Sequence, residues 1–257
     1  MSVLSRLKVI VAQTITSPWV GRIVRAAYGD AIPFSGVRVA SISAFVSPVV
    51  SAKLFWGIYE GAERRFVGRY LDPGLPVVEL GSSIGGVSSH IAQRLEAGQQ
   101  LICIEANPHL LPVLEKNLSV NAAHLKARAV HAAVSSEPDS VSFSISASSL
   151  SSSIAARDDA LEMITAPARK LSDVLREYEL APYQLVMDIE GAEAGIVLDD
   201  VDALGNCARI VAELHETEHH GRRLGIEDLV SAFCALGFEV ADRHGPVVVL
   251  TRPERAA

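Results

Sequence analysis

The sequence lacks the features that mark disulfide-rich, membrane-spanning and secreted proteins. It contains three cysteines, which are odd in number, far apart and without a CxxC pair: Cys103, Cys207 and Cys234. This pattern is typical of buried thiols in a reducing compartment and excludes a disulfide scaffold. No apolar run reaches the length of a membrane span. The N-terminal run VIVAQTI is too short for a signal peptide and lacks a convincing cleavage site. We therefore expect a cytoplasmic protein.

The sequence also lacks an excess of basic residues. The net charge is −7, so there is no global basic field for nucleic acid, and no nucleic-acid partner is expected. In contrast, 49% of the 257 residues are hydrophobic, which supports a sizeable core. We expect a helical extension or cover over residues 1–70 and a larger domain over residues 71–257. Within residues 1–28 the apolar positions fit one helical face, which favours packing against the domain over a weak contact with a membrane surface.

The most informative stretch is PVVELGSSIGGVSS, residues 76–89. It opens with a short β-branched apolar run that predicts a buried strand. Three glycines follow within six residues, where bare backbone can approach a ligand, and apolar residues then recur at helical spacing. Strand, glycine turn and helix together are typical of a nucleotide-type site beyond the carboxyl ends of parallel strands.

Short apolar runs alternate with helical patterns along the rest of the chain. Further strands are predicted over residues 101–104, 129–134, 185–187 and 210–214, and an antiparallel hairpin over residues 238–241 and 247–250. A helix is predicted over residues 51–71, another from Asn107 as its N-cap, and a half-buried edge strand over residues 141–145. This order predicts an α/β fold with a mostly parallel sheet and an antiparallel edge.

The spacing of the glycines points to the cofactor. The motif is ExGxxxGG, from Glu79 to Gly86, whereas a dinucleotide fingerprint has GxGxxG. It is similar to motif I of methyltransferases that use S-adenosylmethionine (SAM), in which the acidic residue usually lies near the methionine part of SAM. Glu105 ends the second strand, where a carboxylate can accept hydrogen bonds from both ribose hydroxyls.

With the later strands included, the chain resembles the FkbM family of SAM-dependent O-methyltransferases over residues 54–253. The resemblance is carried, in order, by LFWGIYE, VVELGSSIGG, ICIEANP, KLSDVL, LVMDIEGAE and IVAELHE. It implies an α/β class I methyltransferase fold of Rossmann-like type, which is a doubly wound, mostly parallel seven-stranded sheet with helices on both faces and an antiparallel C-terminal hairpin. It also implies transfer of a methyl group to a hydroxyl of a sugar, glycolipid, polyketide or similar secondary metabolite. The positions expected to bind SAM are Glu79, Gly81, Ser82, Ser83, Gly85, Gly86, Glu105, Ala106, Asn107, Ala133 and Asp188. Two departures are Glu79, where Asp is common, and Ser82-Ser83, where the family often has Ala-Asn.

An alcohol is a poor acid, so a base or a metal ion should stand near the acceptor. Asp188 and Glu190 follow the fourth strand, and Glu213 and His215 lie around the end of the fifth. We expect Asp188 to face the transfer site and His215 to be the base, because its pKa lies nearest neutrality. Glu190 is either catalytic or a carboxylate at a helix N-terminus, and for Glu193 the helix terminus is favoured.

Several alternatives stay open. A divalent metal held by Asp188, Glu190, Glu213 or His215 is not expected but would polarise the hydroxyl. The letters HETEH at residues 215–219 match the zinc-protease signature, although the first His follows a strand directly. A non-catalytic SAM-binding subunit and a homo-oligomer contact through residues 1–70 are further hypotheses. Trp56, Tyr59 and Glu60 could cover the cofactor site. For the aromatics Trp56 and Tyr59 the helical core is favoured instead, whereas Glu60 is harder to bury without a partner.

Overall fold

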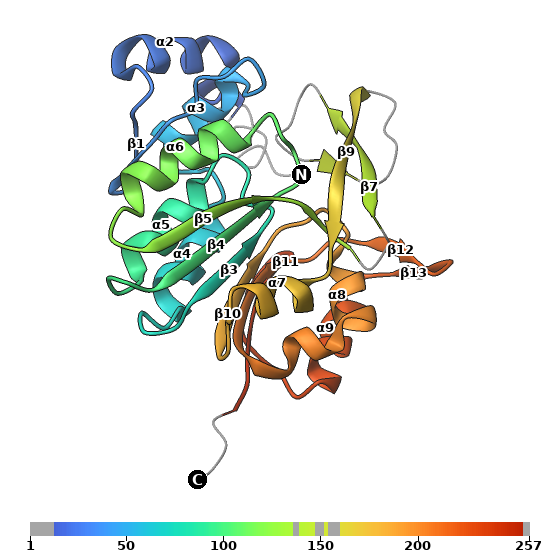
Figure 1. The fold of residues 1–257 in the computed structure, drawn as a ribbon. Helices are drawn as coiled ribbons and strands as arrows, with labels where there is room; N and C mark the ends of the chain where they lie inside the picture. The colour runs from blue at the N-terminus through green and yellow to red at the C-terminus, as the bar shows by residue number, and fades with distance from the viewer. Residues whose placement is uncertain (1–12, 136–138, 147–151, 154–159, 254–257) are drawn as a thin grey trace, which may run out of the picture.

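The computed structural model describes residues 13–135, 139–146, 152–153 and 160–253. Its centre is a seven-stranded sheet in the order β14-β15-β11-β10-β3-β4-β5 (Figure 1). The strands are β3 (Val77–Leu80), β4 (Gln100–Glu105), β5 (Lys126–His131), β10 (Tyr183–Met187), β11 (Cys207–Glu213), β14 (Glu239–His244) and β15 (Val247–Thr251). The first five are parallel, and β15 pairs antiparallel with both β11 and β14. The predicted fold class is confirmed.

The strand order reverses between β3 and β10, because β4 and β5 follow on one side of β3 and the later strands on the other. At such a reversal, the loops that leave the carboxyl ends of the two central strands turn away from each other and leave a crevice between them. The crevice lies between the glycine turn after β3 and the residues after Met187.

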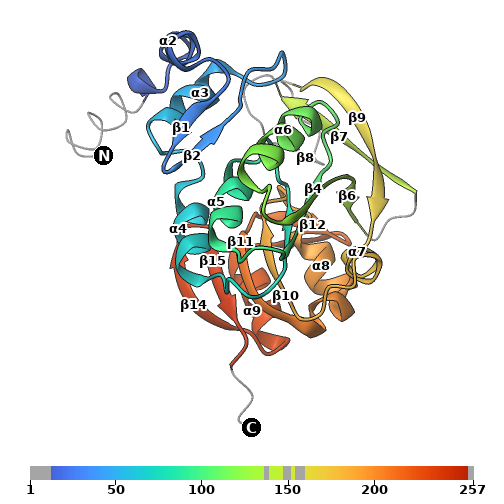
Figure 2. The same ribbon diagram turned by 60° about the vertical axis from the view of Figure 1, so that its left-hand side comes forward.

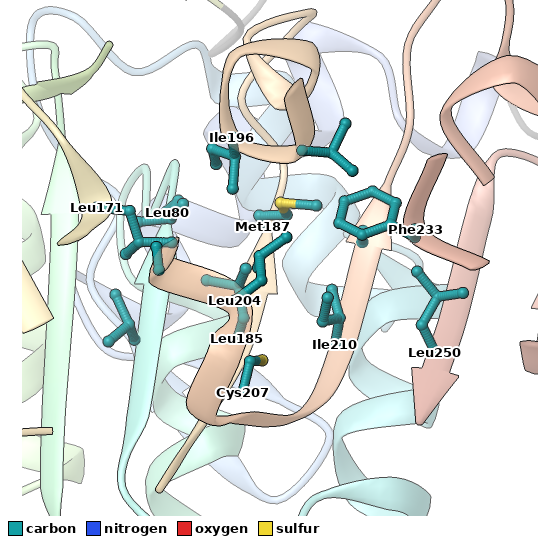
Figure 3. Packing of buried hydrophobic residues seen from close by; sticks show 14 of the residues in the cluster. Leu80, Leu171, Leu185, Met187, Ile196, Leu204, Cys207, Ile210, Phe233 and Leu250 are labelled. Carbon is teal, nitrogen blue, oxygen red and sulfur yellow. The ribbon is translucent and has the colours of Figure 1, made fainter. Parts of the chain in front are cut away.

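Helices cover both faces of the sheet because the central strands are apolar on both sides. On one face α7 (Leu171–Glu177), α8 (Glu193–Asp199) and α9 (Ile226–Ala235) pack on side chains such as Leu185 and Ile210 (Figure 3). On the other, α4 (Gly61–Tyr70), α5 (Gly86–Arg94) and α6 (Leu111–Asn121) pack on Val77, Leu101 and Val211 (Figure 2).

An N-terminal cover lies at one end of this sandwich (Figures 1 and 2). It consists of α2 (Pro18–Tyr28), a hairpin of β1 (Ile32–Phe34) and β2 (Val37–Val39), α3 (Pro48–Phe55) and the loop over residues 56–60. The predicted single helix over residues 51–71 is wrong. It is broken between α3 and α4, where Gly57 and Glu60 have left-handed backbones, with φ of 67° and 42°. The hairpin was not predicted, and residues 1–12 of the segment with one apolar helical face lie outside the described residues.

A second, small sheet stands beside the cover, in the order β6-β9-β7-β8. Its strands are β6 (Ala133–Val134), β7 (Ser140–Ser146), β8 (Ser152–Ser153) and β9 (Ala160–Arg169). The serine-rich segment does form a strand, β7, but β7 pairs on both sides and is not an edge strand. The strand predicted over residues 129–134 is divided between β5 and β6, so its two parts belong to different sheets.

Three local predictions also fail. Asn107 does not cap a helix: its side chain accepts a hydrogen bond from the His109 N–H in a turn, and α6 begins later, at Leu111. Cys234 is exposed, whereas Cys103 and Cys207 are buried. Trp56 is 47% exposed and so does not belong to the core. Among the described residues, no helix is long and apolar enough to cross a membrane.

Candidate active site

A cavity of about 300 Å³ lies at the crevice where the strand order reverses. Its floor comes from the residues that end β3, β4 and β10. Its walls come from the cover, including Tyr59 and Glu60, and from the small sheet, including Phe143. One cavity therefore joins the three parts of the fold.

The glycine turn shapes the floor of this cavity. Gly81 has φ of 78°, and its N–H donates to the Ile104 carbonyl over 2.9 Å. A Cβ at this position would lie 1.9 Å from the carbonyl oxygen of Asp188, so only glycine lets the two strand ends approach this closely. At Gly86 a Cβ would lie 2.8 Å from the ring of Tyr59, which places the cover directly on the start of α5.

Glu105 is buried beside the turn and lines the cavity. Its two carboxylate oxygens accept hydrogen bonds from the N–H groups of Ser83 and Asn107, each over 2.7 Å. Burial raises the pKa of Glu105, while these backbone hydrogen bonds lower it. Each oxygen keeps a second lone pair, so the carboxylate is held in place and can still accept from a ligand.

The residues predicted to bind SAM fall into two groups. Those that line the cavity are Gly81, Ser83, Glu105, Ala106, Ala133 and Asp188. Those that do not line it are Glu79, Ser82, Gly85, Gly86 and Asn107. Glu79 is 3% exposed and accepts a hydrogen bond from the Ser88 hydroxyl, and burial raises its pKa to about 7. The structure thus places Glu79 beneath the turn, where it ties the turn to α5.

The predicted catalytic residues do come together. The Nε2 atom of His215 lies 3.8 Å from Asp188 Oδ1, 3.9 Å from Glu190 Oε2 and 4.0 Å from Glu213 Oε1. On its other side, His215 Nδ1 is hydrogen-bonded to Glu193 Oε1 over 2.9 Å. One imidazole is therefore surrounded by four carboxyl groups, which come from the end of β11, the residues after β10 and the first turn of α8.

This surrounding changes the expected ionisation. Burial lowers the pKa of His215, but the hydrogen bond to Glu193 and the nearby carboxylates outweigh it and raise the pKa to about 9. The reason given for His215 as the base, a pKa near neutrality, is therefore wrong, because the ring is protonated at neutral pH. Burial raises the pKa of Asp188 to about 7, despite the opposing charge of His215. Of the two, only Asp188 lines the cavity.

Glu193 has a role that the sequence analysis did not find. It lies in the first turn of α8, as expected for a helix-terminal carboxylate, but it is fully buried and holds His215. Its neighbours Ala194, Ile196 and Val197 are apolar, and this was the available signal that the first turn faces the core.

Tyr59 and Glu60 both line the cavity. Tyr59 is also buried in the hydrophobic cluster of the cover, as expected for an aromatic residue of the core. The Tyr59 hydroxyl lies 3.4 Å from Ser83 Oγ. Burial, followed by the charge of Asp188, raises the pKa of Glu60 well above its usual value. The cover thus contributes a carboxyl group to the cavity.

The zinc-protease interpretation of HETEH fails on geometry. Residues Thr217–His219 form β12, which pairs with β13 (Arg222–Leu224), so His215 and His219 do not share a helical face. His219 is hydrogen-bonded to Asp199 instead. Of the four residues considered for a divalent metal, Asp188, Glu190 and His215 have ligand atoms within 4.8 Å of one another.

The cavity fits SAM on three observations. Glu105 presents a fixed carboxylate where ribose hydroxyls are expected. The Gly81 turn leaves no side chain between β3 and the cavity. Asp188 Oδ1 is buried and makes no hydrogen bond with any described residue, so the cavity holds an unused acceptor.

Comparison with known proteins gives the family. Residues 79–240 match the family described as the methyltransferase FkbM domain. No curated protein matches the sequence. Similar solved structures include a precorrin-6y C5,15-methyltransferase from Geobacter metallireducens, which is 13% identical over 83% of this chain and 92% of that chain, with a TM-score of 0.43. A ribosomal protein L11 methylase from Lactobacillus delbrueckii is 9% identical over 77% of this chain and 80% of that chain, with a TM-score of 0.43. TrmK of M. capricolum, in complex with S-adenosylhomocysteine, is 6% identical over 73% and 65%, with a TM-score of 0.40. The family match spans more than half of the chain, and the protein belongs to the FkbM family of SAM-dependent methyltransferases.

Proposed function

We propose that the protein is an O-methyltransferase, which moves the methyl group of SAM to a hydroxyl of a sugar, glycolipid, polyketide or similar metabolite. This proposal rests on the position and the ionisation of Asp188. Its carboxyl group lines the cofactor cavity, has an oxygen without a hydrogen-bond partner among the described residues, and has a pKa of about 7. A group with these properties can take a proton at neutral pH.

The acceptor is proposed to enter through a second cavity, of about 690 Å³, which shares Val134, Glu190 and Ala192 with the first. This second cavity is lined mainly by polar and charged side chains, among them Lys170, Asp199 and His219. Such a lining suits a molecule that carries several hydroxyl groups. Glu190, between the two cavities, would orient the hydroxyl toward Asp188.

When bound, SAM would supply an electrophilic methyl group on a sulfonium, whose sulfur would keep the electron pair of the carbon–sulfur bond. Asp188 would accept the proton that the acceptor hydroxyl loses when its oxygen takes the methyl group. Protonated His215 lies 3.8 Å from Asp188 and stabilises its carboxylate before the transfer. Glu193 fixes the ring so that Nε2 faces Asp188. The chain thus provides alignment and a proton acceptor.

The test combines binding and turnover. Asp188→Asn should lower kcat for an alcohol acceptor by about 100-fold or more, the usual effect of losing a general base. Its dissociation constant for S-adenosylhomocysteine should change only a few-fold. Asp173→Asn is the matched control, which should leave kcat unchanged, since Asp173 is paired with Arg176 on α7 and lines neither cavity. Unchanged kcat in Asp188→Asn would remove Asp188 as the base.

The product decides the reaction type. With labelled SAM and a panel of sugar and polyketide alcohols, the label should appear as a methyl ether. A methyl group on nitrogen or carbon would overturn O-methylation, and SAM binding without turnover on any alcohol would favour the non-catalytic subunit. Assays with and without Mg²⁺ address the metal alternative. We also place the reaction in the cytoplasm, which the three free cysteines support.

A further inference from the structure

The charge of the chain is divided unevenly along its length. Residues 1–59 carry six Lys and Arg but only one acidic residue, Asp30, whereas residues 60–257 carry 17 basic and 29 acidic residues. The acidic character of the protein therefore belongs to its sheet domain, and the cover is basic. Asp30 is itself paired with Lys116, whose Nζ lies 2.7 Å from its Oδ2, so its charge is locally compensated.

An apolar groove of about 430 Å³ lies on the basic cover, between α2 and the end of α3. Apart from Thr14, its lining residues are apolar or aromatic. Three of its large side chains are unusually exposed for their type: Trp19 is 56% exposed, Ile23 57% and Trp56 47%. A cluster of large exposed apolar side chains on one surface marks an interaction site. We refer to this surface as the α2–α3 groove.

Basic side chains flank the groove. Arg22 is exposed on α2 beside Ile23, and Lys53 is exposed on α3 near Trp56. Lys53 also lines the cofactor cavity, as does the exposed Ile58. The apolar and basic surface therefore continues from the α2–α3 groove to the mouth of the active site.

We propose that the α2–α3 groove binds the surface of an anionic lipid membrane. Tryptophan favours the boundary between water and lipid, where its apolar ring and its N–H are both accommodated. Lys and Arg beside apolar side chains add attraction to anionic headgroups. A partner protein would need an apolar surface that fits the groove and acidic side chains opposite its basic flanks. An anionic bilayer offers an apolar interior and anionic headgroups over any contact area. This inference does not depend on the proposed O-methylation.

The two tryptophans make the proposal directly measurable, because the sequence contains no others. The full-length protein is mixed with vesicles of phosphatidylcholine and phosphatidylglycerol in equal parts, or of phosphatidylcholine alone. With the anionic vesicles, tryptophan emission should shift to shorter wavelength and the protein should sediment with the lipid. Neutral vesicles should bind at least tenfold more weakly, and 0.5 M NaCl should release the protein from the anionic ones.

Variants locate the contact. Ile23→Asp should abolish sedimentation, whereas Leu198→Asp should not; Leu198 is also apolar, 44% exposed and helical, but it lies on α8, away from the cover (Figure 1). Arg22→Glu should weaken binding several-fold and serves if Ile23→Asp does not fold. Absence of vesicle binding by the full chain overturns the proposal, as does binding that survives both cover variants. A dimer in solution that Ile23→Asp converts to a monomer would show instead that a second copy occupies the groove.

Discussion

Replacing Glu193 with glutamine should discharge His215. The variant keeps the shape of a fully buried side chain and an oxygen that can accept the His215 Nδ1–H bond, but it removes the negative charge 2.9 Å from the ring. In the wild type, burial lowers the pKa of His215, and Glu193 is the first of the groups that raise it, ahead of Asp188 and Glu190. Without the Glu193 charge, we expect the pKa of His215 to fall from about 9 toward its ordinary value.

The magnitude follows from linkage. A rise in pKa from 6.5 in the unfolded chain to about 9 in the folded protein corresponds to about 3 kcal/mol, since one pKa unit is worth about 1.4 kcal/mol. The folded-state pKa is the higher one, so this contribution is fully present below pH 6.5 and is lost as pH rises through 9. The free energy of unfolding of the wild type should therefore fall over this range, and that of Glu193→Gln should fall much less.

Two measurements check the prediction. Proton NMR of the imidazole follows the pKa of His215 directly, with His215→Asn used to assign its resonance among the eight histidines. Urea denaturation at pH 6 and pH 9 gives the change in the free energy of unfolding. Glu216→Gln is the control, because Glu216 adjoins His215 in sequence but is exposed and paired with Arg223. A His215 pKa that stays near 9 in Glu193→Gln would refute the assignment of its charge to Glu193.

Three further predictions concern stability and are measured by urea denaturation. Gly81→Ala should lower the free energy of unfolding by about 3 kcal/mol, because of left-handed strain and the clash with Asp188. Gly98→Ala, which is also left-handed but in open space, should lower it by about 1 kcal/mol. Equal losses in the two variants would contradict the clash. Asn117→Ala should cost about 3 kcal/mol, because this buried side chain bonds backbone groups of both the cover and the glycine turn; a loss below 1 kcal/mol would show these bonds to be unimportant. The raised pKa of Glu79 makes its contribution to the free energy of unfolding present below pH 4.5 and lost as pH rises through 7. Glu79→Gln should therefore flatten the decline in stability between pH 4.5 and 7. An unchanged slope of stability against pH would contradict this.

The sheet could be predicted from the sequence because its strands are apolar on both faces. Runs such as residues 185–187 can be buried only inside a sheet covered on both sides, and the helical patterns between them require parallel connections. The small sheet could not be predicted in the same way. Its strand β9 contains Pro167 and does not alternate regularly between apolar and polar residues, so no period distinguishes it from a loop.

The candidate site could also be predicted from the sequence only in part. The sequence predicts that Asp188 and His215 meet, because the carboxyl ends of neighbouring parallel strands share one edge. It does not predict which of them is protonated, because the pKa of His215 depends on four carboxyl groups from β10, β11 and α8 that come together only in the folded chain. For this reason the pKa expected for His215 was wrong, although the location of the cluster was predicted correctly.

The break between α3 and α4 shows what a helical period can conceal. Apolar positions on both sides of the break fit one continuous helix, yet a continuous helix would carry Tyr59 and Glu60 along its axis, away from the glycine turn. The left-handed backbones at Gly57 and Glu60 turn the chain so that Tyr59 packs on Gly86 and Glu60 reaches the cavity. Left-handed backbone at a glutamate is uncommon and persists only where the surrounding packing imposes it. The departure from the helical pattern therefore lies where the cover meets the cofactor cavity, and it is the step by which residues far from the glycine turn in sequence come to line the cavity.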